Sequence, residues 1–252
     1  MSALPTSGRK DHFSPRGYLR GFVHPNRAGD QKPLWVLDVP TRRWNLRSPA
    51  EFGYIRGLYD YSDPSSRPDS AEDAFRRPEN DFPTVRERIR SEGYDSWNEH
   101  RDDLVRFAAM LSARTPMFLQ QFKAESSIGD PAKAHDVALD AMRSEISDRF
   151  LRWRRLFWVL RYSPDPDDAV VTADHAIGVE GRALTLVAAA SDPRTTVFVP
   201  LARDMCLFGA VVPLSPITAR FLRPDLETLR QFVFAQASQF VVSTIPLIQK
   251  GA

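Results

Sequence analysis

The residues that could do chemistry are concentrated near the amino terminus, between His12 and Phe22. This segment reads His-Phe-Ser-Pro-Arg-Gly-Tyr-Leu-Arg-Gly-Phe. An imidazole titrates near neutral pH, so His12 is a candidate acid, base or ligand. A guanidinium group makes bidentate contacts with carboxylates and phosphates, so Arg16 and Arg20 are candidate anion contacts. The alternative for His12 is structural: its ring would bond a backbone group or a carboxylate and hold the start of the fold in place.

Two residues further along the chain extend this candidate site. Arg114 lies in apolar surroundings before Thr115-Pro116, and a guanidinium there must be paired or must bind an anion. Asp174 follows a short apolar stretch, and loops at strand ends often carry functional side chains. The alternatives are structural: an Asx-turn at Asp174 supported by Thr172, or a buried ion pair between Arg114 and Asp174.

The predicted site therefore contains catalytic and substrate-binding groups. The catalytic candidates are His12, Arg114 and Asp174, and the substrate-binding candidates are Arg16, Tyr18, Arg20 and Thr172. The sequence contains no metal-ligand spacing, no phosphate-binding glycine-rich loop and no nucleophile elbow, so it indicates no metal and no cofactor. A metal held by His12, Asp174 and another carboxylate from distant segments remains an alternative.

The elements that position these residues follow from hydrophobic periodicity and turn residues. The chain is expected to be extended from Tyr18. Further strands are expected at Leu34–Asp38, Arg43–Leu46, Val170–Thr172, Leu184–Ala188, Thr196–Val199, Met205–Phe208 and Gly209–Val212. Helices are expected from Ser48, at Ser70–Arg77 within a loop over 60–84, at Phe82–Glu92, after the capping box Ser96–Glu99, at Met117–Phe122, over Leu139–Leu160 and over Leu226–Ser243. Pro116 should interrupt the helix that precedes it.

This order of strands, helices, strands and a helix indicates an α+β fold. Alternating βαβ units are absent, so the simplest arrangement is a mixed or antiparallel sheet that joins amino- and carboxy-terminal strands, with a central inserted helical region. A disordered tail over residues 1–10 and one domain over residues 11–247 are expected, because the first residues are polar and basic.

Several motifs, in this order, resemble one family. His12-Phe13-Ser14-Pro15 followed by Tyr18-Leu19-Arg20-Gly21-Phe22 resembles the His-Tyr-Val-Pro signature of a widespread, mostly bacterial family, the domain of unknown function 4238. Further resemblances are Leu34–Asp38, Phe107 through Arg114-Thr115-Pro116, Val171–Asp174 and Val199-Pro200-Leu201. Together they cover approximately residues 10 to 245. The resemblance implies no established reaction.

The chain also departs from the family pattern. Phe13 and Ser14 replace the tyrosine and valine of the signature, and Ala173 and Ala176 stand where serine and proline are usual. Arg230-Gln231 occupies the region where the last helix of the family often carries an asparagine. If that asparagine serves a shared function, this member has altered or lost it.

Composition limits the partners of the chain. The net charge is only +2, which argues against general binding to polyanions, although 29 of the 34 basic residues are arginine. The predicted long helix carries a run of them that could follow a phosphate backbone. These are Arg149, Arg152, Arg154, Arg155 and Arg161. The alternative is a solvated face neutralised by Glu145 and Asp148.

The remaining composition indicates a cytoplasmic location and no membrane partner. Cys206 is the only cysteine, which excludes a disulfide within the chain and favours a reducing compartment. No apolar run approaches the ~20 residues of a membrane helix, and the first ten residues lack the apolar centre of a signal peptide. The sequence does not indicate an oligomeric state.

Two functional hypotheses follow. The first is a hydrolase or nuclease-like enzyme that acts on a phosphate-bearing substrate, including nucleic acid. The second is a non-catalytic binding or accessory protein of a bacterial defence or toxin-like system, in which the polar residues only hold the fold together. Under the enzyme hypothesis, His12, Arg114 and Asp174 should line one open cleft. Under the accessory-protein hypothesis, they should be buried and satisfied by one another.

Overall fold

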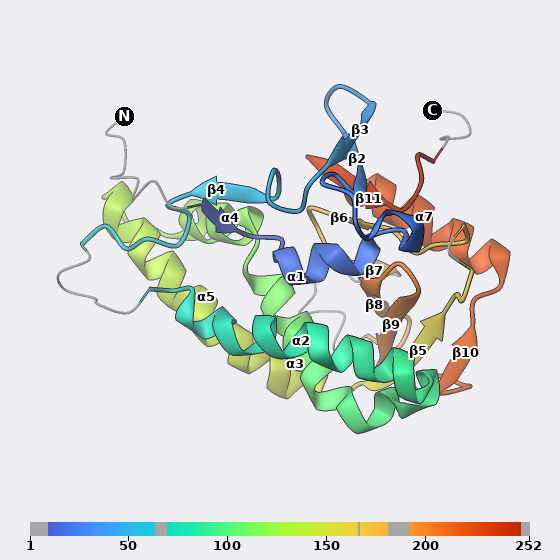
Figure 1. The fold of residues 1–252 in the computed structure, drawn as a ribbon. Helices are drawn as coiled ribbons and strands as arrows, with labels where there is room; N and C mark the ends of the chain where they lie inside the picture. Colours follow the sequence, from blue (N-terminus) through green and yellow to red (C-terminus); the bar gives the residue numbers. More distant parts are fainter. Residues whose placement is uncertain (1–9, 64–69, 166, 181–191, 248–252) are drawn as a thin grey trace.

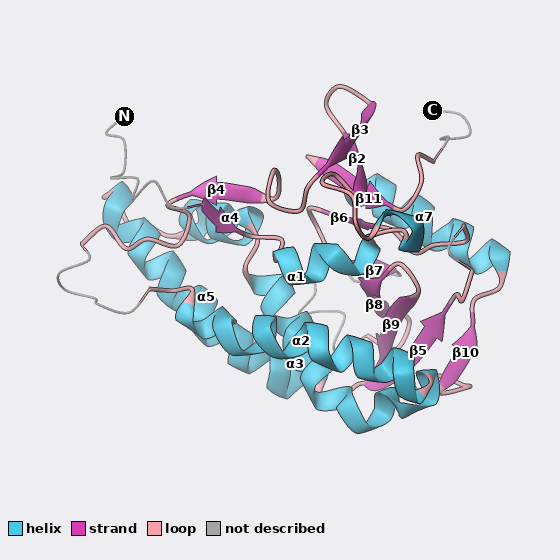
Figure 2. Ribbon diagram, in the orientation of Figure 1, coloured by secondary structure: helices cyan, strands magenta, loops and turns pink. Residues whose placement is uncertain are grey.

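Strands from both ends of the chain flank a helical middle (Figures 1 and 2). The computed structural model describes residues 10–63, 70–165, 167–180 and 192–247. Its elements are β1 (Lys10–His12), α1 (Arg16–Leu19), η1 (Arg20–Phe22), η2 (Pro25–Arg27), β2 (Leu34–Asp38), β3 (Arg43–Arg47), β4 (Tyr54–Arg56), α2 (Asp73–Glu92), η3 (Tyr94–His100), α3 (Arg101–Ala113), α4 (Pro116–Glu125), α5 (Pro131–Trp153), β5 (Phe157–Tyr162), β6 (Thr172–Ala173), β7 (Gly178–Glu180), β8 (Thr196–Ala202), β9 (Met205–Ala210), β10 (Thr218–Arg220), α7 (Arg223–Gln236) and β11 (Phe240–Ser243). The predicted α+β class is confirmed.

Three sheets are present among the described residues, where one was expected. The sheet in the order β3-β2-β11-β6 joins strands from the two ends of the chain, because Val241 of β11 lies opposite Leu37 of β2 and Ala173 of β6. A second sheet has the order β10-β5-β9-β8-β7 and is mixed, since β10 runs parallel to β5. The third pairs β1 with β4 and so fixes the backbone at His12, opposite Tyr54.

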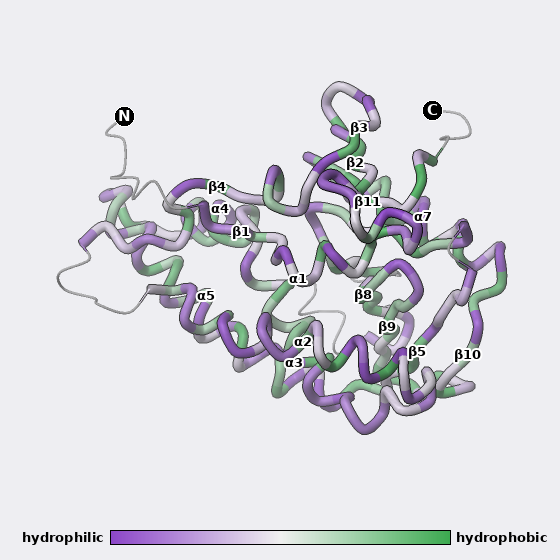
Figure 3. Tube along the Cα trace, viewed as in Figure 1, coloured by the Kyte–Doolittle hydropathy of each residue, from purple (hydrophilic) through white to green (hydrophobic). Residues whose placement is uncertain are grey.

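The helices α2, α3 and α5 pack side by side, and the segment containing α1 lies against α2 (Figure 1). Hydrophobic and hydrophilic residues alternate along α2 and α5, as expected of helices with one buried face (Figure 3). The ring of Phe82 stacks on that of Phe107 at a centroid distance of 3.7 Å and joins α2 to α3. None of the described helices combines the length and the apolar character that a membrane crossing requires.

The segment after Tyr18 is helical, so the prediction of an extended chain is wrong. Tyr18, Leu19 and Phe22 are buried, whereas Arg16 and Arg20 are exposed. The spacing i, i+1, i+4 places the apolar side chains on one side of two consecutive helical turns, and the spacing i, i+4 places the arginines on the other. Tertiary burial of three large side chains outweighs the short length of this helix.

Two glycines let this segment approach its neighbours closely. A Cβ on Gly17 would lie 3.0 Å from Pro83 Cγ of α2. A Cβ on Gly21 would lie 2.6 Å from Nη1 of Arg86 and 3.3 Å from the carbonyl oxygen of Leu201. In each of the two Arg-Gly pairs, Arg16-Gly17 and Arg20-Gly21, the arginine is exposed and the glycine lies close to a neighbouring element.

A single helix, α2, replaces the predicted loop from Asp73 onward and joins most of the two helices predicted at Ser70–Arg77 and Phe82–Glu92. Pro78 and Pro83 both lie inside it. Each proline removes one backbone hydrogen bond, but burial of the α2 face outweighs this cost. The buried residues of that face are Phe75, Phe82, Val85, Arg86 and Ile89.

The helix predicted from Ser48 is a turn. The Glu51 carboxylate accepts a hydrogen bond from Ser48 N at 3.1 Å, and Ser48 Oγ accepts one from Ala50 N at 3.4 Å. The contacts of a capping box are thus formed, although no helix follows Ser48. Gly53, at a φ of 68°, then turns the chain into β4.

Two predicted helices are too long. The stripe to Leu160 breaks after Trp153, where the indole nitrogen of Trp158 donates a hydrogen bond of 2.7 Å to the carbonyl oxygen of Trp153 and the chain enters β5. The last helix ends at Gln236, and β11 follows, because the carboxylate of Asp174 bonds the backbone between them.

Other predictions are confirmed. The hairpin of Leu34–Asp38 with Arg43–Leu46 is β2 and β3, and the helix predicted after Ser96–Glu99 is α3. The capping box itself is wrong, because Ser96–Glu99 lie inside η3 and α3 begins at Arg101 without a side-chain cap. The break at Pro116 separates α3 from α4, where the predicted segment Met117–Phe122 is helical. The strand predicted at Leu184–Ala188 and residues 1–9 of the predicted tail lie outside the described residues.

Gly21→Ala is expected to lower the free energy of unfolding by about 1–3 kcal/mol, because the added Cβ must displace Arg86 or the backbone of Leu201. Denaturant unfolding measures the change. Gly29→Ala is the matched control, since no heavy atom lies within 4 Å of its added Cβ, and it should change stability by less than about 0.5 kcal/mol. Equal effects of the two substitutions would contradict the close approach at Gly21.

Candidate functional site

A polar cavity of about 320 Å³ lies where the amino-terminal segment meets α2 and the end of α3. It contains three of the predicted site residues, His12, Arg16 and Arg114. The full lining is His12, Pro15, Arg16, Gly17, Glu72, Glu79, Asn80, Pro83 and Arg114. The structure thus brings the signature segment and the Arg114 element into one site, although they are about a hundred residues apart in the sequence.

Arg114 forms the inner wall of the cavity and is 1 % exposed. Its guanidinium forms an ion pair with the Glu79 carboxylate and donates a hydrogen bond to the carbonyl oxygen of His12. The group also lies over the Phe75 ring, 4.4 Å from its centroid. Burial lowers the pKa of Arg114, so the buried charge requires these partners. The alternative ion pair between Arg114 and Asp174 is wrong, because Glu79 takes that place.

Tyr59 holds the backbone of Arg114, and Asp11 in turn holds the backbone of Tyr59. The Tyr59 hydroxyl donates a hydrogen bond of 2.6 Å to the carbonyl oxygen of Arg114. The Asp11 carboxylate accepts one of 3.0 Å from Tyr59 N. Thr115 Oγ1 then accepts a bond of 3.2 Å from Phe118 N and caps α4, with Pro116 in its first turn. The Arg-Thr-Pro element therefore combines a buried charge with a helix start.

His12 lies at the cavity as a neutral base. Its Nε2 accepts a hydrogen bond of 3.3 Å from Nε of Arg16, and its ring packs against Tyr54. Burial, followed by the charges of Arg16 and Arg114, lowers the pKa of His12 to about 4. The exposed guanidinium of Arg16 can bind an anion, and the neutral His12 nitrogen beside it can take up a proton.

Asp174 does not line the cavity. Its carboxylate accepts hydrogen bonds from Ser238 N at 3.1 Å, Ser238 Oγ at 2.5 Å, Gln239 N at 3.1 Å and Phe240 N at 3.4 Å. It is 4 % exposed and fixes the turn that leads into β11. The Asx-turn alternative is therefore wrong, because the backbone donors lie 64 to 66 residues away in the sequence and are not local. The carboxylate instead holds the start of β11.

Tyr18 and Thr172 form a buried bridge between α1 and the sheets. The Tyr18 hydroxyl donates a hydrogen bond of 2.8 Å to the carbonyl oxygen of Pro200, so its 2.7 Å contact with Thr172 Oγ1 is donated by the threonine. Burial raises the pKa of Tyr18, which stays protonated. Arg20 is exposed and is not part of the cavity lining. Of the four predicted substrate contacts, the structure places Arg16 in the cavity.

The predicted basic ridge does not form. Arg149 is buried and pairs with Glu145 at 2.7 Å, and Arg152 pairs with the same carboxylate at 2.6 Å. Arg154 pairs with Asp102 at 3.0 Å, while Arg161 lies on β5 and not on the helix. Because these arginines point to different partners, they do not make one phosphate-binding track.

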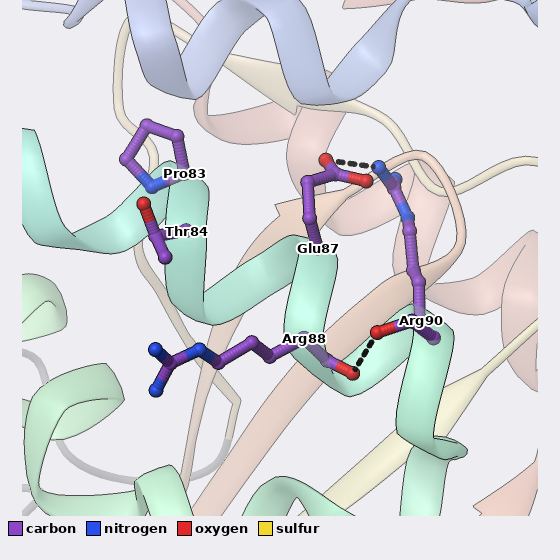
Figure 4. Close-up of a pocket in the computed structure, with 6 residues that line it drawn as sticks. Pro83, Thr84, Glu87, Arg88 and Arg90 are labelled. Carbon is purple, nitrogen blue, oxygen red and sulfur yellow. Dashed lines mark hydrogen bonds and ion pairs between the residues drawn. The ribbon is translucent and has the colours of Figure 1, made fainter.

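A shallow depression of about 730 Å³ adjoins the cavity along α2, and Pro83 lines both. Figure 4 shows Glu87 and Arg90 pointing toward one another across it, paired at 2.8 Å, whereas Arg88 extends away from that pair. Arg90 also makes a bidentate contact with Asp204 of the β8–β9 turn. The depression thus contributes one exposed guanidinium, Arg88, next to the cavity.

No three or more His, Cys, Asp or Glu side chains in the described ranges come together in an arrangement that could hold a metal ion. His12 and Asp174, the two ligands proposed for a metal held by distant segments, lie in different hydrogen-bond networks.

Sequence analysis missed Glu79, Tyr59 and Asp11. Glu79 falls in the proline-rich stretch that was expected to be a loop, so its partnership with Arg114 was not visible. A helical reading of that stretch would have placed it on the same face as Phe75 and Phe82, since the spacings are four and three residues. A charge on an apolar stripe indicates a buried partner of opposite sign.

The comparison with known families gives one match. The model of the DUF4238 family, described as a protein of unknown function, matches residues 10–208. The chain belongs to this family. No curated protein and no solved structure matches the chain significantly. Two of the elements that carried the DUF4238 resemblance, His12-Phe13-Ser14-Pro15 and Arg114-Thr115-Pro116, meet at the cavity, and Val171–Asp174 supports the sheet.

The imidazole of His12 is expected to titrate with a pKa of about 4, well below the ordinary 6.5. The folded state then binds its proton less tightly than the unfolded state. Stability from this group is complete above pH 6.5 and is lost as the pH falls toward 4. NMR titration of the imidazole signals measures the pKa, and His12→Gln assigns the signal. A His12 pKa at or above 6.5 would contradict the buried neutral imidazole.

Asp174→Ala is expected to lower the free energy of unfolding by about 2–4 kcal/mol, because it leaves buried backbone donors of Gln239 and Phe240 unsatisfied. Thermal and denaturant unfolding measure the loss. Asp165→Ala, at an exposed carboxylate, is the control and should cost less than about 1 kcal/mol. A fully stable Asp174→Ala protein would instead assign Asp174 a role outside the fold.

Proposed function

We propose that this DUF4238 member is a cytoplasmic hydrolase that acts on a phosphate-bearing substrate in the His12 cavity, and that the substrate class to test first is nucleic acid. The observation that supports the proposal is the contact between the His12 imidazole and Arg16 at the cavity. His12 supplies a neutral proton acceptor, and Arg16 supplies a positive charge that is 3.3 Å away and exposed.

In the proposed reaction the phosphate group binds Arg16 by charge-assisted hydrogen bonds. Arg16 then leaves Nε2 of His12, which accepts a proton from an attacking water molecule. The water oxygen forms a bond to phosphorus, the bond from phosphorus to the leaving oxygen breaks, and the proton held by His12 passes to that oxygen. Arg16 neutralises the charge that builds on the phosphate oxygens during this step.

Arg114 and Glu79 act as positioning residues in this proposal. Arg114 is bonded to the backbone of His12 and not to its ring, so the pair fixes where the imidazole lies without competing for its proton. Because Glu79 neutralises Arg114, the substrate charge is left to Arg16. In this proposal Arg114 therefore has a structural role, and Arg16 binds the substrate.

The depression along α2 favours an extended substrate. It begins at Pro83, on the rim of the cavity, and carries Arg88 without a partner carboxylate among the described ion pairs. A polymer with a phosphate in the His12 cavity could place a neighbouring phosphate near Arg88. This is the reason to test nucleic acid before small phosphate esters.

A specific observation also favours the second hypothesis, a non-catalytic binding or accessory protein of a bacterial defence or toxin-like system. Tyr18, Thr172 and Asp174 are buried and satisfied by other groups of the fold. These residues therefore stabilise the fold, and of the predicted site only His12, Arg16 and Arg114 line the cavity.

The decisive experiment compares hydrolysis of single- and double-stranded DNA and RNA and of a chromogenic phosphodiester, with and without Mg²⁺ or Mn²⁺. His12→Gln is expected to lower kcat about 10²–10⁴-fold, the usual contribution of a general base. Arg16→Gln is expected to raise KM about tenfold or more. The melting temperature of each variant must stay near that of the wild type.

Arg20→Gln is the matched control, because Arg20 is an exposed arginine of the same segment that does not line the cavity, and its activity should equal that of the wild type. Absence of turnover on every substrate, with phosphate binding that depends on Arg16, would support the binding protein. Activity that survives His12→Gln would refute the assigned base.

A further inference from the structure

A second cavity, of about 300 Å³, lies between the β10-β5-β9-β8-β7 sheet and α7. It shares no lining residue with the His12 cavity. The sheet contributes Val159, Arg161, Thr196, Phe198 and Phe208, α7 contributes Asp225, Thr228, Leu229 and Phe232, and Leu214 and Phe221 complete the lining. Ligand pockets in proteins have volumes from about 300 Å³ and combine apolar walls with a few polar groups, as this one does.

Four phenylalanines form a continuous aromatic wall. Phe198 lies 6.4 Å from Phe208 and 6.1 Å from Phe232, and Phe208 lies 6.0 Å from Phe221, between ring centroids. Gly178 keeps this wall in place, because any Cβ there would lie 1.9 Å from Cζ of Phe198. The Phe198 ring can therefore lie over the neighbouring strand. A planar apolar molecule would contact ring faces and edges in this space.

Arg161 provides a positive charge at this wall. It lies on the same face of the sheet as Val159 and Phe208, which pair directly across β5 and β9. Its Nη1 donates a hydrogen bond of 2.9 Å to the carbonyl oxygen of Pro216, which orients the side chain. Arg161 forms no ion pair with any described carboxylate. Burial lowers its pKa, and the charge of Asp225 opposes that shift.

Asp225 is the other charged residue of the lining. It is exposed in the first turn of α7, where a carboxylate is favourable next to the helix amino terminus. It influences Arg161 through space without pairing to it. An oriented guanidinium with unused donors therefore faces an aromatic cavity and lacks a contacting counter-ion.

We infer that this cavity binds a small planar aromatic carboxylate, with the ring system against the phenylalanine wall and the carboxylate on Arg161. A guanidinium offers five N–H donors in a planar fork that matches a carboxylate, and one of them is occupied by Pro216. The neighbouring charge of Asp225 weakens, but does not replace, this contact. The inference is independent of the proposed hydrolase site.

The test uses the full chain and two probes of equal shape, indole-3-acetate and the uncharged indole-3-acetamide, in ligand-observed NMR and calorimetric titrations. Indole-3-acetate is expected to bind at least about tenfold more tightly than the amide. Arg161→Gln should lower indole-3-acetate affinity about tenfold and leave amide binding unchanged. Asp225→Asn should raise indole-3-acetate affinity severalfold, because a repelling charge is removed.

Thr228→Tyr is expected to abolish binding of both probes, because it fills the cavity from an exposed position of α7 and so should leave the fold intact. Arg223→Gln is the matched control, since Arg223 is an exposed arginine of the same helix that does not line the cavity. Melting temperatures confirm that each variant is folded. Undetectable indole-3-acetate binding to the wild type, equal binding of acid and amide, or unchanged binding by folded Arg161→Gln would each overturn the inference.

Discussion

Arg114 places a positive charge where water does not reach it, and the candidate site is built from the groups that compensate for that charge. Its partners come from three separate segments. The Glu79 carboxylate and the Phe75 ring lie on α2, the His12 carbonyl on β1, and the Tyr59 ring between β4 and α2. A buried charge is tolerated only when it is paired and hydrogen-bonded. The position of His12 therefore depends on a contact made through its backbone, while its ring remains available to the cavity.

The same use of arginine recurs through the molecule and explains part of the excess of arginine over lysine. Buried Arg86 donates to the carbonyl oxygen of Gly17 at 2.9 Å and joins α2 to α1, and Arg90 joins α2 to the β8–β9 turn through Asp204. Arg149 joins α5 to α3 through the Ser112 hydroxyl. Arginine suits this task because its fork makes several directed bonds at once. The excess of arginine over lysine is thus a property of the packing between elements as much as of any surface.

Local sequence patterns correctly predicted the elements whose structure is set by neighbouring residues. The β2–β3 hairpin and α3 follow from alternation, helical periodicity and a proline, and each is present. The α2 helix was not predicted because its two prolines disfavour a helix locally. Burial of its apolar face in the folded protein stabilises the helix despite them. For the site, burial correctly required a partner or an anion for Arg114, and Asp174 was one candidate, whereas the partner is Glu79. Long-range pairing cannot be inferred from spacing when the intervening elements are misplaced.

His12 and its two arginines show how one cavity can separate stability from binding. Arg114 is locked by an ion pair and by aromatic rings, so its charge is already neutralised within the fold. Arg16 is exposed and makes one contact of 3.3 Å, to a neutral imidazole that gives it no counter-charge. In the proposed reaction an entering anion would therefore bind Arg16 more strongly than the neutral imidazole does. Once Arg16 moved toward the anion, Nε2 of His12 would lose its donor and the charge that, after burial, is the next largest cause of its lowered pKa. In the proposed hydrolase, binding of the anion and proton uptake by His12 would be coupled for this reason, which is the property that a hydrolytic base requires.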